Sequence, residues 1–263
     1  MNEFIQQIAT ELRSAADRCA PIDPVRGRLP ENDLDAAYKV QDENTRYHLS
    51  QGRRIVGRKI GLTSAAVQRQ LGVNQPDFGM LFADMEEREG LPIPVGKLIQ
   101  PKIETEIAFI LGRDLTVEQP TIADVLRATE FVLPALEIVD SRIRDWSIQI
   151  VDTIADNASS GLYVLGGPPR QIKDLDLRNM QMVMHRGDEQ VSQGTGSACL
   201  GSPLNAFVWL ASEMVHRERP LQAGDVILSG ALGPMVAVQQ GDLFVAQVHG
   251  LGSVSAEFAV QPE

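Results

Sequence analysis

The feature that most constrains this chain is a pair of glutamates inside an apolar segment. Residues 101–111 read Pro-Lys-Ile-Glu-Thr-Glu-Ile-Ala-Phe-Ile-Leu. As a strand, this segment places Glu104 and Glu106 on one face with Ala108 and Ile110, while the other face carries only Ile, Thr and Phe side chains. Two largely apolar faces are typical of a strand that is buried on both sides. We therefore expect two carboxylates to point together into an enclosed space.

A second apolar segment carries a third glutamate. Residues 131–139 read Phe-Val-Leu-Pro-Ala-Leu-Glu-Ile-Val, and as a strand they place Glu137 among apolar neighbours. A buried carboxylate without a partner is costly, so Glu104, Glu106 and Glu137 need a compensating charge. Oxygen ligands of this kind suit hard divalent cations such as Mg²⁺ or Mn²⁺. Pairing of the glutamates with arginines, or an exposed edge strand, are the alternative explanations.

The charge balance limits the partners of the chain. The sequence holds 24 Lys and Arg against 35 Asp and Glu residues, a net charge of −11. This argues against nucleic acid as a partner, because phosphate binding needs a basic face. The two cysteines form no disulfide framework or metal pair, which is typical of a reducing compartment. Since the sequence shows no signal peptide and no transmembrane run, we expect a cytoplasmic protein without a membrane partner.

Helical patterns are few. Apolar spacing predicts helices over residues 2–19 and about 33–50. A Thr-x-x-Asp capping box at Thr121 predicts a third helix to about Glu130, and Ser202 followed by proline opens a fourth. The remaining chain has short strand patterns separated by glycines.

The distribution of these patterns predicts two units. Residues 1–53 form a small N-terminal helical unit, and residues 54–263 form a strand-rich catalytic domain. The fold class is α+β, with a sheet sandwich or roll as the core.

Six longer segments resemble a known family. The segments at 57–63, 71–79 and 101–106 resemble the fumarylacetoacetate hydrolase superfamily, and those at 137–146, 155–161 and 230–235 resemble its 2-oxopent-4-enoate hydratase branch. They occur in collinear order over nearly the whole chain, which makes them far more specific than any short motif here.

The resemblance implies a fold, an assembly and a metal. It implies a mixed β-sandwich or roll for the catalytic domain and a ring-like homo-oligomer. It also implies a Mg²⁺ or Mn²⁺ ion held by the carboxylates at Glu104, Glu106 and Glu137. Association with neighbouring enzymes of the same pathway is a further expectation.

The resemblance also implies a substrate, 2-hydroxypenta-2,4-dienoate, a small dienol acid from the meta-cleavage of aromatic rings. A 2-oxo acid can chelate a metal through its C1 carboxylate and C2 oxygen. Protonation of the dienol at C5 would give a conjugated enone, and water would then add at C4 to give 4-hydroxy-2-oxopentanoate.

Two residues are expected to handle protons. Lys59 matches the active-site lysine of the superfamily, and the adjacent Gly57 and Gly61 leave room for substrate. An apolar setting near a metal would lower its pKa. Asp77 matches a family residue near the metal site and is expected to orient Lys59 or a water. From the residues alone, a solvated lysine and a turn aspartate remain the alternatives.

Substrate binding is assigned to residues beside glycines. Ser160 and Ser229 are candidates for hydrogen bonds to the substrate carboxylate, and the backbone at Gly230 can approach an anion closely. Capping of a turn or helix is the alternative for both serines. Arg142 and Arg144 could bind a carboxylate or join subunits, and the sequence does not decide between these.

Other reaction classes fit less well. The four histidines are scattered without a zinc motif, and neither a GxSxG elbow nor a GxGxxG loop is present. The hydrolytic members of the superfamily typically place a histidine in a lid, whereas this sequence has no histidine between His48 and His185. The alternatives that remain are a 4-oxalocrotonate decarboxylase, a hydratase of a longer 2-oxo-alkenedioate, and a catalytically idle partner subunit.

Overall fold

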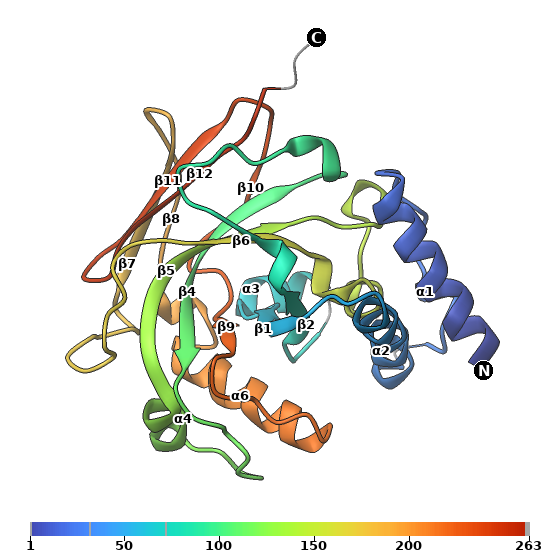
Figure 1. The fold of residues 1–263 in the computed structure, drawn as a ribbon, viewed down its shortest axis with the longest axis horizontal. Helices are drawn as coiled ribbons and strands as arrows, with labels where there is room; N and C mark the ends of the chain where they lie inside the picture. The colour runs from blue at the N-terminus through green and yellow to red at the C-terminus, as the bar shows by residue number, and fades with distance from the viewer. Residues whose placement is uncertain (1, 32, 72, 261–263) are drawn as a thin grey trace.

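A large curled sheet forms the centre of the molecule (Figure 1). The computed structural model describes residues 2–31, 33–71 and 73–260, so Gly72 of the segment at 71–79 lies outside it. Among the described residues, eight strands form this sheet in the order β2-β1-β9-β4-β5-β6-β3, with β10 paired to β4. The strands are β1 (Ile55–Gly61), β2 (Asp77–Phe82), β3 (Glu86–Glu87), β4 (Lys102–Leu111), β5 (Thr129–Val139), β6 (Ser160–Leu165), β9 (Val226–Leu228) and β10 (Val236–Ala237).

A second, smaller sheet packs on the first. Its order is β12-β11-β7-β8, and β11 and β12 lie against β5, while β12 also reaches β6. The strands are β7 (Gln181–Arg186), β8 (Glu189–Thr195), β11 (Leu243–Val248) and β12 (Gly252–Glu257). Two packed sheets with few helices confirm the predicted α+β sandwich or roll.

Strand β9 joins two hairpin-like pairs in the main sheet. It lies between β1 and β4, parallel to β1 and antiparallel to β4, and so connects the β1–β2 pair to the β4–β5 pair. The approach of β1 to β9 requires glycine at Gly57, because a Cβ there would lie 1.8 Å from the Val226 carbonyl oxygen. The strand that carries Lys59 is thereby fixed beside the strand that leads to Ser229 and Gly230.

Six helices surround the sheets within the described residues. They are α1 (Asn2–Asp17), α2 (Leu34–Ser50), α3 (Ala65–Leu71), α4 (Ile122–Ala128), α5 (Ile150–Ala155) and α6 (Pro203–His216). Short 3₁₀ turns occur at Arg26–Arg28, Ala83–Met85, Val95–Lys97, Arg144–Trp146, Asn157–Ser159 and Gly196–Ala198. In Figure 1, α1 and α2 stand to one side of the main sheet, and α6 lies below it beside α4.

The predicted helices are present, with differences at their ends. The capping box at Thr121 forms as predicted: the Thr121 side chain accepts from the Asp124 N–H, and the Asp124 side chain accepts from the Thr121 N–H. Helix α4 stops at Ala128 rather than Glu130, because Thr129 already pairs with Leu111 in the β4–β5 ladder. Helix α1 likewise ends at Asp17, two residues before the predicted end. Helices α3 and α5 were not predicted, since seven and six residues are too short to show a helical period.

The N-terminal helices share the core of the molecule. The ring of Tyr38 stacks on that of Phe78 at a centroid distance of 4.6 Å, and the Gln41 amide donates to the Phe78 and Ile154 carbonyls. Buried side chains of α1 and α2 belong to the same apolar cluster as those of the sheets. A division at residue 53 as a domain boundary stays a prediction.

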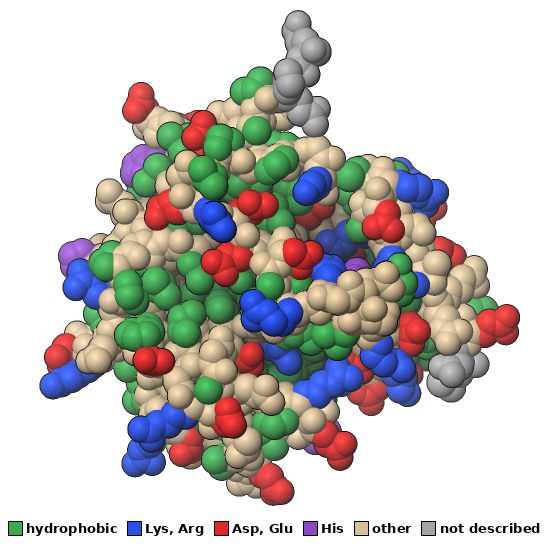
Figure 2. All heavy atoms as spheres, viewed as in Figure 1, with side chains coloured by type: hydrophobic (Ala, Val, Ile, Leu, Met, Phe, Trp, Pro, Cys, Tyr) green, Lys and Arg blue, Asp and Glu red, His purple; other side chains and the backbone are tan. Residues whose placement is uncertain are grey.

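The surface matches the acidic composition. On the face in Figure 2, Lys and Arg side chains are interspersed with Asp and Glu. Over the described part of the chain, the longest apolar helices fall short of what a bilayer crossing needs.

Candidate active site

The three glutamates meet on one face of the β4–β5 pair. The antiparallel register sets Glu104 directly opposite Glu137, and it sets Glu106 opposite Ala135. One carboxylate oxygen from each glutamate lies within 4.8 Å of the others. The period-two alternation used on the sequence therefore identified a real cluster. The glutamates do not lie on an exposed edge strand, because β4 and β5 are both inside the sheet. Within the described part of the chain they are not paired with arginines either, since the cation in contact with them is Lys59.

This glutamate cluster lacks enough partners of its own. Glu106 and Glu137 are fully buried and Glu104 is half-buried. The Gly230 N–H donates to Glu106 Oε2 at 2.7 Å, whereas Glu106 Oε1 and Glu137 Oε2 have no hydrogen-bond partner among the described residues. Burial, and then the charge of Glu137, raise the pKa of Glu104 to about 7 and that of Glu106 well above its usual range. An oxygen-only set with orphaned buried acceptors fits a hard divalent cation.

Lys59 supplies one positive charge to this cluster. Its ammonium lies 3.1 Å from Glu137 Oε1 and donates to the Ala158 carbonyl at 3.0 Å. Burial lowers the pKa of Lys59, but the charges of Glu137, Glu104, Asp77 and Glu106 together raise it above the ordinary lysine value. The expected lowering by burial is present, but the sequence did not show how many carboxylates surround this amine. A lowered pKa beside a bound metal stays a prediction. Lys59 is held as a cation.

Asp77 lies beside Lys59 across the β1–β2 ladder. It pairs with Gly61 in the register, and its Oδ2 accepts the Thr153 hydroxyl at 2.8 Å. Its Oδ1 is buried without a partner among the described residues, and burial raises the pKa of the carboxyl. A Cβ on Gly61 would lie 2.2 Å from Asp77 Oδ1 and 3.6 Å from Lys59 Nζ. The missing side chain of Gly61 therefore leaves the space between the acid and the amine.

The loop that holds Lys59 has an unusual backbone. Asn157, Ala158 and Ser159 all have left-handed φ angles of 55°, 51° and 52°. Such a run is strained for residues other than glycine and persists only when its surroundings impose it. Here it aims the Ala158 carbonyl at Lys59. Sequence reasoning missed both Ala158 and Thr153. Ala158 lies in the segment at 155–161 that resembles the family, whereas Thr153 lies outside every such segment.

The two arginines left open by the sequence have different places. Arg142 is largely buried, pairs with Asp156 and donates to the Ser160 carbonyl at 2.8 Å, so it braces the left-handed loop from inside. Arg144 is exposed and pairs with Asp23. Neither contacts the glutamate cluster through any bond recorded for the described residues.

The serines proposed for substrate have backbone partners. Ser160 donates its hydroxyl to the Asn157 carbonyl at 2.8 Å. The Ser229 hydroxyl accepts from the Ile107 N–H and donates to the Gly230 carbonyl, each at 3.0 Å. The Gly230 N–H is engaged by Glu106. The Ser160 contact lies within a turn, as in the capping alternative, whereas Ser229 ties its segment to strand β4. Substrate binding by Ser160, Ser229 and Gly230 stays a prediction.

The space at Gly61 gives a direct test. We expect Gly61→Ala to lower kcat about a hundredfold, since displacing a catalytic group by about 1 Å has effects of that size. Stabilisation of the protein by added Mn²⁺ should remain, because the glutamate cluster is not touched. Gly27→Ala is the matched control, since nothing lies within 4 Å of a Cβ there. Steady-state kinetics measure this effect. If kcat of Gly61→Ala equalled that of wild type, Asp77 and Lys59 would not act together in one site.

The fold and the carboxylate cluster define a class of protein. The sequence profile of the fumarylacetoacetate hydrolase C-terminal domain matches residues 57–259, and the chain belongs to this family. It is 61% identical to 2-keto-4-pentenoate hydratase 2 of Dechloromonas aromatica, over 98% of this chain and 99% of that protein. It is 57% identical to the TodF product hydratase of Pseudomonas putida strain F1, over 97% and 95% of the two chains.

A solved structure shows the same architecture. The 4-oxalocrotonate decarboxylase of Pseudomonas putida G7, in complex with magnesium and adipate, superimposes with a TM-score of 0.94. It is 35% identical, and the match covers 98% of each chain.

Proposed function

We propose that this chain is a hydro-lyase that hydrates 2-oxopent-4-enoate, also called 2-keto-4-pentenoate, in the meta-cleavage catabolism of aromatic compounds. The substrate is taken as its enol, 2-hydroxypenta-2,4-dienoate, and the product is 4-hydroxy-2-oxopentanoate. The main support for this proposal is the sequence identity of 61% to a hydratase over nearly the full chain. The buried arrangement of Lys59, Asp77 and the three glutamates supports a catalytic rather than an idle subunit.

The site would hold one divalent metal. Glu104, Glu106 and Glu137 are the ligands, and Mg²⁺ or Mn²⁺ suits their oxygen-only set. When bound, such a cation supplies Lewis-acid polarisation of the 2-oxo group of the substrate. Gly230 holds Glu106 in place through its N–H, which leaves the other oxygen of Glu106 free for a ligand bond.

Lys59 and Asp77 would handle the protons. Because Lys59 is kept protonated, it acts as an acid or a cationic partner toward the dienol, and C5 is the carbon that gains a proton. Asp77 has one oxygen free, and its raised pKa suits it to take a proton from water. Addition of that water places OH at C4 and hydrogen at C3. Thr153 fixes the orientation of Asp77 through its hydroxyl.

The decarboxylase reaction is the second candidate. The structural match to 4-oxalocrotonate decarboxylase favours it, because two enzymes of one fold can use the same 2-oxo-acid head group. The identity of 35% is well below the 61% to the hydratase, so we place the decarboxylase second. A hydratase acting on a longer 2-oxo-alkenedioate would need a basic group at the far end of the pocket.

The test follows the ultraviolet absorbance of freshly generated 2-hydroxypenta-2,4-dienoate. We expect its loss when protein and Mn²⁺ or Mg²⁺ are present, with 4-hydroxy-2-oxopentanoate as the product and little turnover after chelation. Inactivity here, together with CO₂ release from 4-oxalocrotonate, would move the chain to the decarboxylase reaction. Full activity after complete removal of divalent metal would contradict the cofactor assignment.

We also propose an oligomeric state, partners and a cellular location. A ring-like homo-oligomer and association with neighbouring pathway enzymes stay predictions, which light scattering and co-purification can check. The two cysteines, Cys19 and Cys199, are both free thiols, which supports a cytoplasmic location.

A further inference from the structure

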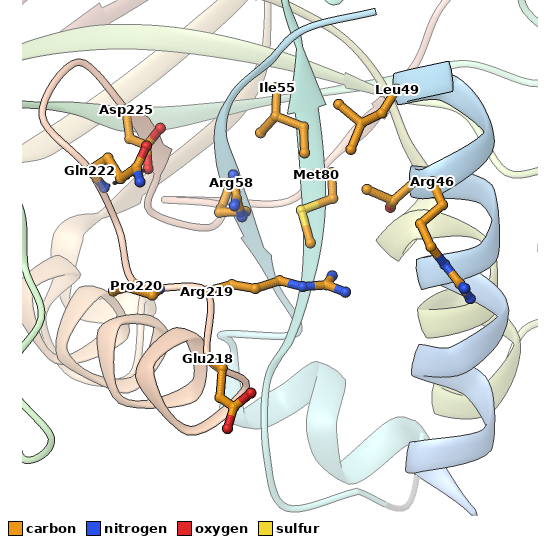
Figure 3. Close-up of a pocket in the computed structure, with 11 residues that line it drawn as sticks. Arg46, Leu49, Ile55, Arg58, Met80, Glu218, Arg219, Pro220, Gln222 and Asp225 are labelled. Atoms are coloured by element: carbon orange, nitrogen blue, oxygen red, sulfur yellow. Dashed lines mark hydrogen bonds between the residues drawn. The ribbon is translucent and has the colours of Figure 1, made fainter. Parts of the chain in front are cut away.

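A cavity lies behind the candidate active site. It has a volume of about 410 Å³ and lies between α2, the pair β1–β2 and the segment that links α6 to β9 (Figure 3). Arg58 lines it, and Arg58 precedes Lys59 on β1. Since successive side chains of a strand point to opposite faces, this Arg58 cavity and the glutamate cluster are on opposite sides of β1. The lining residues are Thr45, Arg46, Leu49, Ile55, Arg58, Met80, Glu218, Arg219, Pro220, Gln222 and Asp225.

Arg58 is buried without a counter-ion. Only 7% of the residue is exposed, and its Nη1 donates to the carbonyl of its own neighbour Gly57 at 2.8 Å. Its Nε has no hydrogen-bond partner, and among the described residues no carboxylate oxygen comes within ion-pair distance of its guanidinium. Burial lowers the pKa of Arg58, and the charges of Asp225 and Arg219 act on it in opposite directions. A buried charge in this condition is costly unless something else compensates it.

The other arginines of the cavity already have partners. Arg219 Nη1 lies 2.6 Å from Asp42, and Arg46 lies 2.8 Å from Glu43. Figure 3 shows Arg219 extending toward α2, away from Arg58. Glu218 and Asp225 also line the cavity, but neither lies within ion-pair distance of Arg58. Arg58 is therefore the arginine of the cavity whose guanidinium still lacks a carboxylate partner within the described chain.

The wall beside Arg58 is apolar. Ile55, Met80 and Leu49 line it from β1, β2 and α2 (Figure 3). A guanidinium presents a planar pair of N–H donors that matches a carboxylate, and it binds such a group through two hydrogen bonds. A doubly charged phosphate would be repelled more strongly by the lining carboxylates of Glu218 and Asp225, and it would leave the apolar wall unused.

We propose that the Arg58 cavity is a second binding site, separate from the catalytic one, for a small organic monocarboxylate with a short apolar body. The carboxylate pairs with Arg58, and the apolar body packs on Ile55, Met80 and Leu49. This role accounts for a buried arginine that the protein itself leaves unpaired. It does not depend on which reaction the glutamate cluster supports.

Titration calorimetry with pentanoate tests this site. The full-length protein is used after chelation, so that no cation in the glutamate cluster can capture the probe. We expect saturable binding in wild type and in Glu106→Gln, and an affinity at least about tenfold lower in Arg58→Met, since bonds to a charged group have energies of this order. The neutral analogue pentanamide should not bind. The exposed Arg113→Gln variant is the charge-matched control and should bind as wild type does.

Stability separates a ligand site from a structural role. Without a probe, Arg58→Met should melt at or above the wild-type temperature, because a buried unpaired charge is removed. A structural arginine would give a lower melting temperature instead. If Arg58→Met does not fold, Leu49→Trp on the outer wall fills the cavity and should abolish pentanoate binding.

Several results would overturn the proposal. One is pentanoate binding to Arg58→Met or Leu49→Trp with the wild-type affinity. Another is loss of pentanoate binding in Glu106→Gln but not in Arg58→Met. A third is binding of inorganic phosphate, but not of pentanoate, to wild type. A change of oligomeric state in Arg58→Met, with no pentanoate binding in wild type, would also overturn it, since the cavity would then receive an acidic side chain of another copy.

Discussion

Replacing Glu106 with glutamine is expected to abolish metal-dependent activity while leaving the fold intact. Glutamine keeps an oxygen that can accept the Gly230 N–H, but it removes one of the three charges that we propose hold the cation. We expect hydration to slow about a thousandfold, which is the effect of losing one strong electrostatic contact to a transition state. Metal affinity should fall by at least about a hundredfold, since even residues behind the ligands contribute up to that much.

The same variant should melt at a higher temperature than wild type when both are metal-free. Burial and mutual repulsion raise the pKa values of these glutamates, so the loss of one charge relieves the cluster. Melting curves with and without Mn²⁺ check this, and the Mn²⁺-induced increase should disappear in Glu106→Gln. Glu130→Gln, an exposed position on β5, is the matched control. A wild-type turnover number in Glu106→Gln would exclude this carboxylate as a metal ligand.

Replacing Lys59 with methionine should have the largest combined effect on stability and rate. The variant leaves Glu137 buried without its cation, and breaking a buried pair in this way costs about 3–5 kcal/mol. For a chain of this size the metal-free melting temperature should fall by roughly 10 °C. Added Mn²⁺ should restore part of that loss, because it supplies positive charge to the same carboxylates.

The rate should not recover with the stability. Proton transfer by a positioned group contributes about 10²–10⁴-fold, so Lys59→Met should remain at least about a hundredfold slower at saturating Mn²⁺. Lys39→Met, at an exposed position of α2, tests whether loss of any lysine has these effects. If saturating Mn²⁺ returned both melting temperature and kcat to wild-type values, Lys59 would be only a counter-ion of the cluster.

The glutamate cluster could be predicted because strand alternation is a local rule. Glu104 and Glu106 are two residues apart, so their common face follows from the sequence, and the apolar context indicated burial. The rule does not say which strand pairs with which. That Glu137 would stand directly opposite Glu104 depended on the β4–β5 register, which only the structure shows.

The environment of Lys59 could not be predicted because it depends on distant segments. Glu137, Asp77 and the Ala158 carbonyl reach it from three other parts of the chain. The surrounding carboxylates outweigh the effect of burial on its pKa, and no local rule shows this. Thr153 lies in a helix of six residues, too short to be recognised. The contacts of Ser229 and Gly230 with the backbone and with Glu106 also join distant segments, so no local rule indicates them.

The position of β9 determines when the site can form during synthesis. The pairs β1–β2 and β4–β5 are each local in sequence and can form as the ribosome releases them. In the described sheet they are joined by β9, whose residues 226–228 are translated long afterwards. At about 5–20 residues per second the nascent chain waits several seconds with unpaired strand edges. The glutamate cluster on β4 and β5 can therefore form before Lys59 of β1 is fixed beside it, and chaperones would act in that interval.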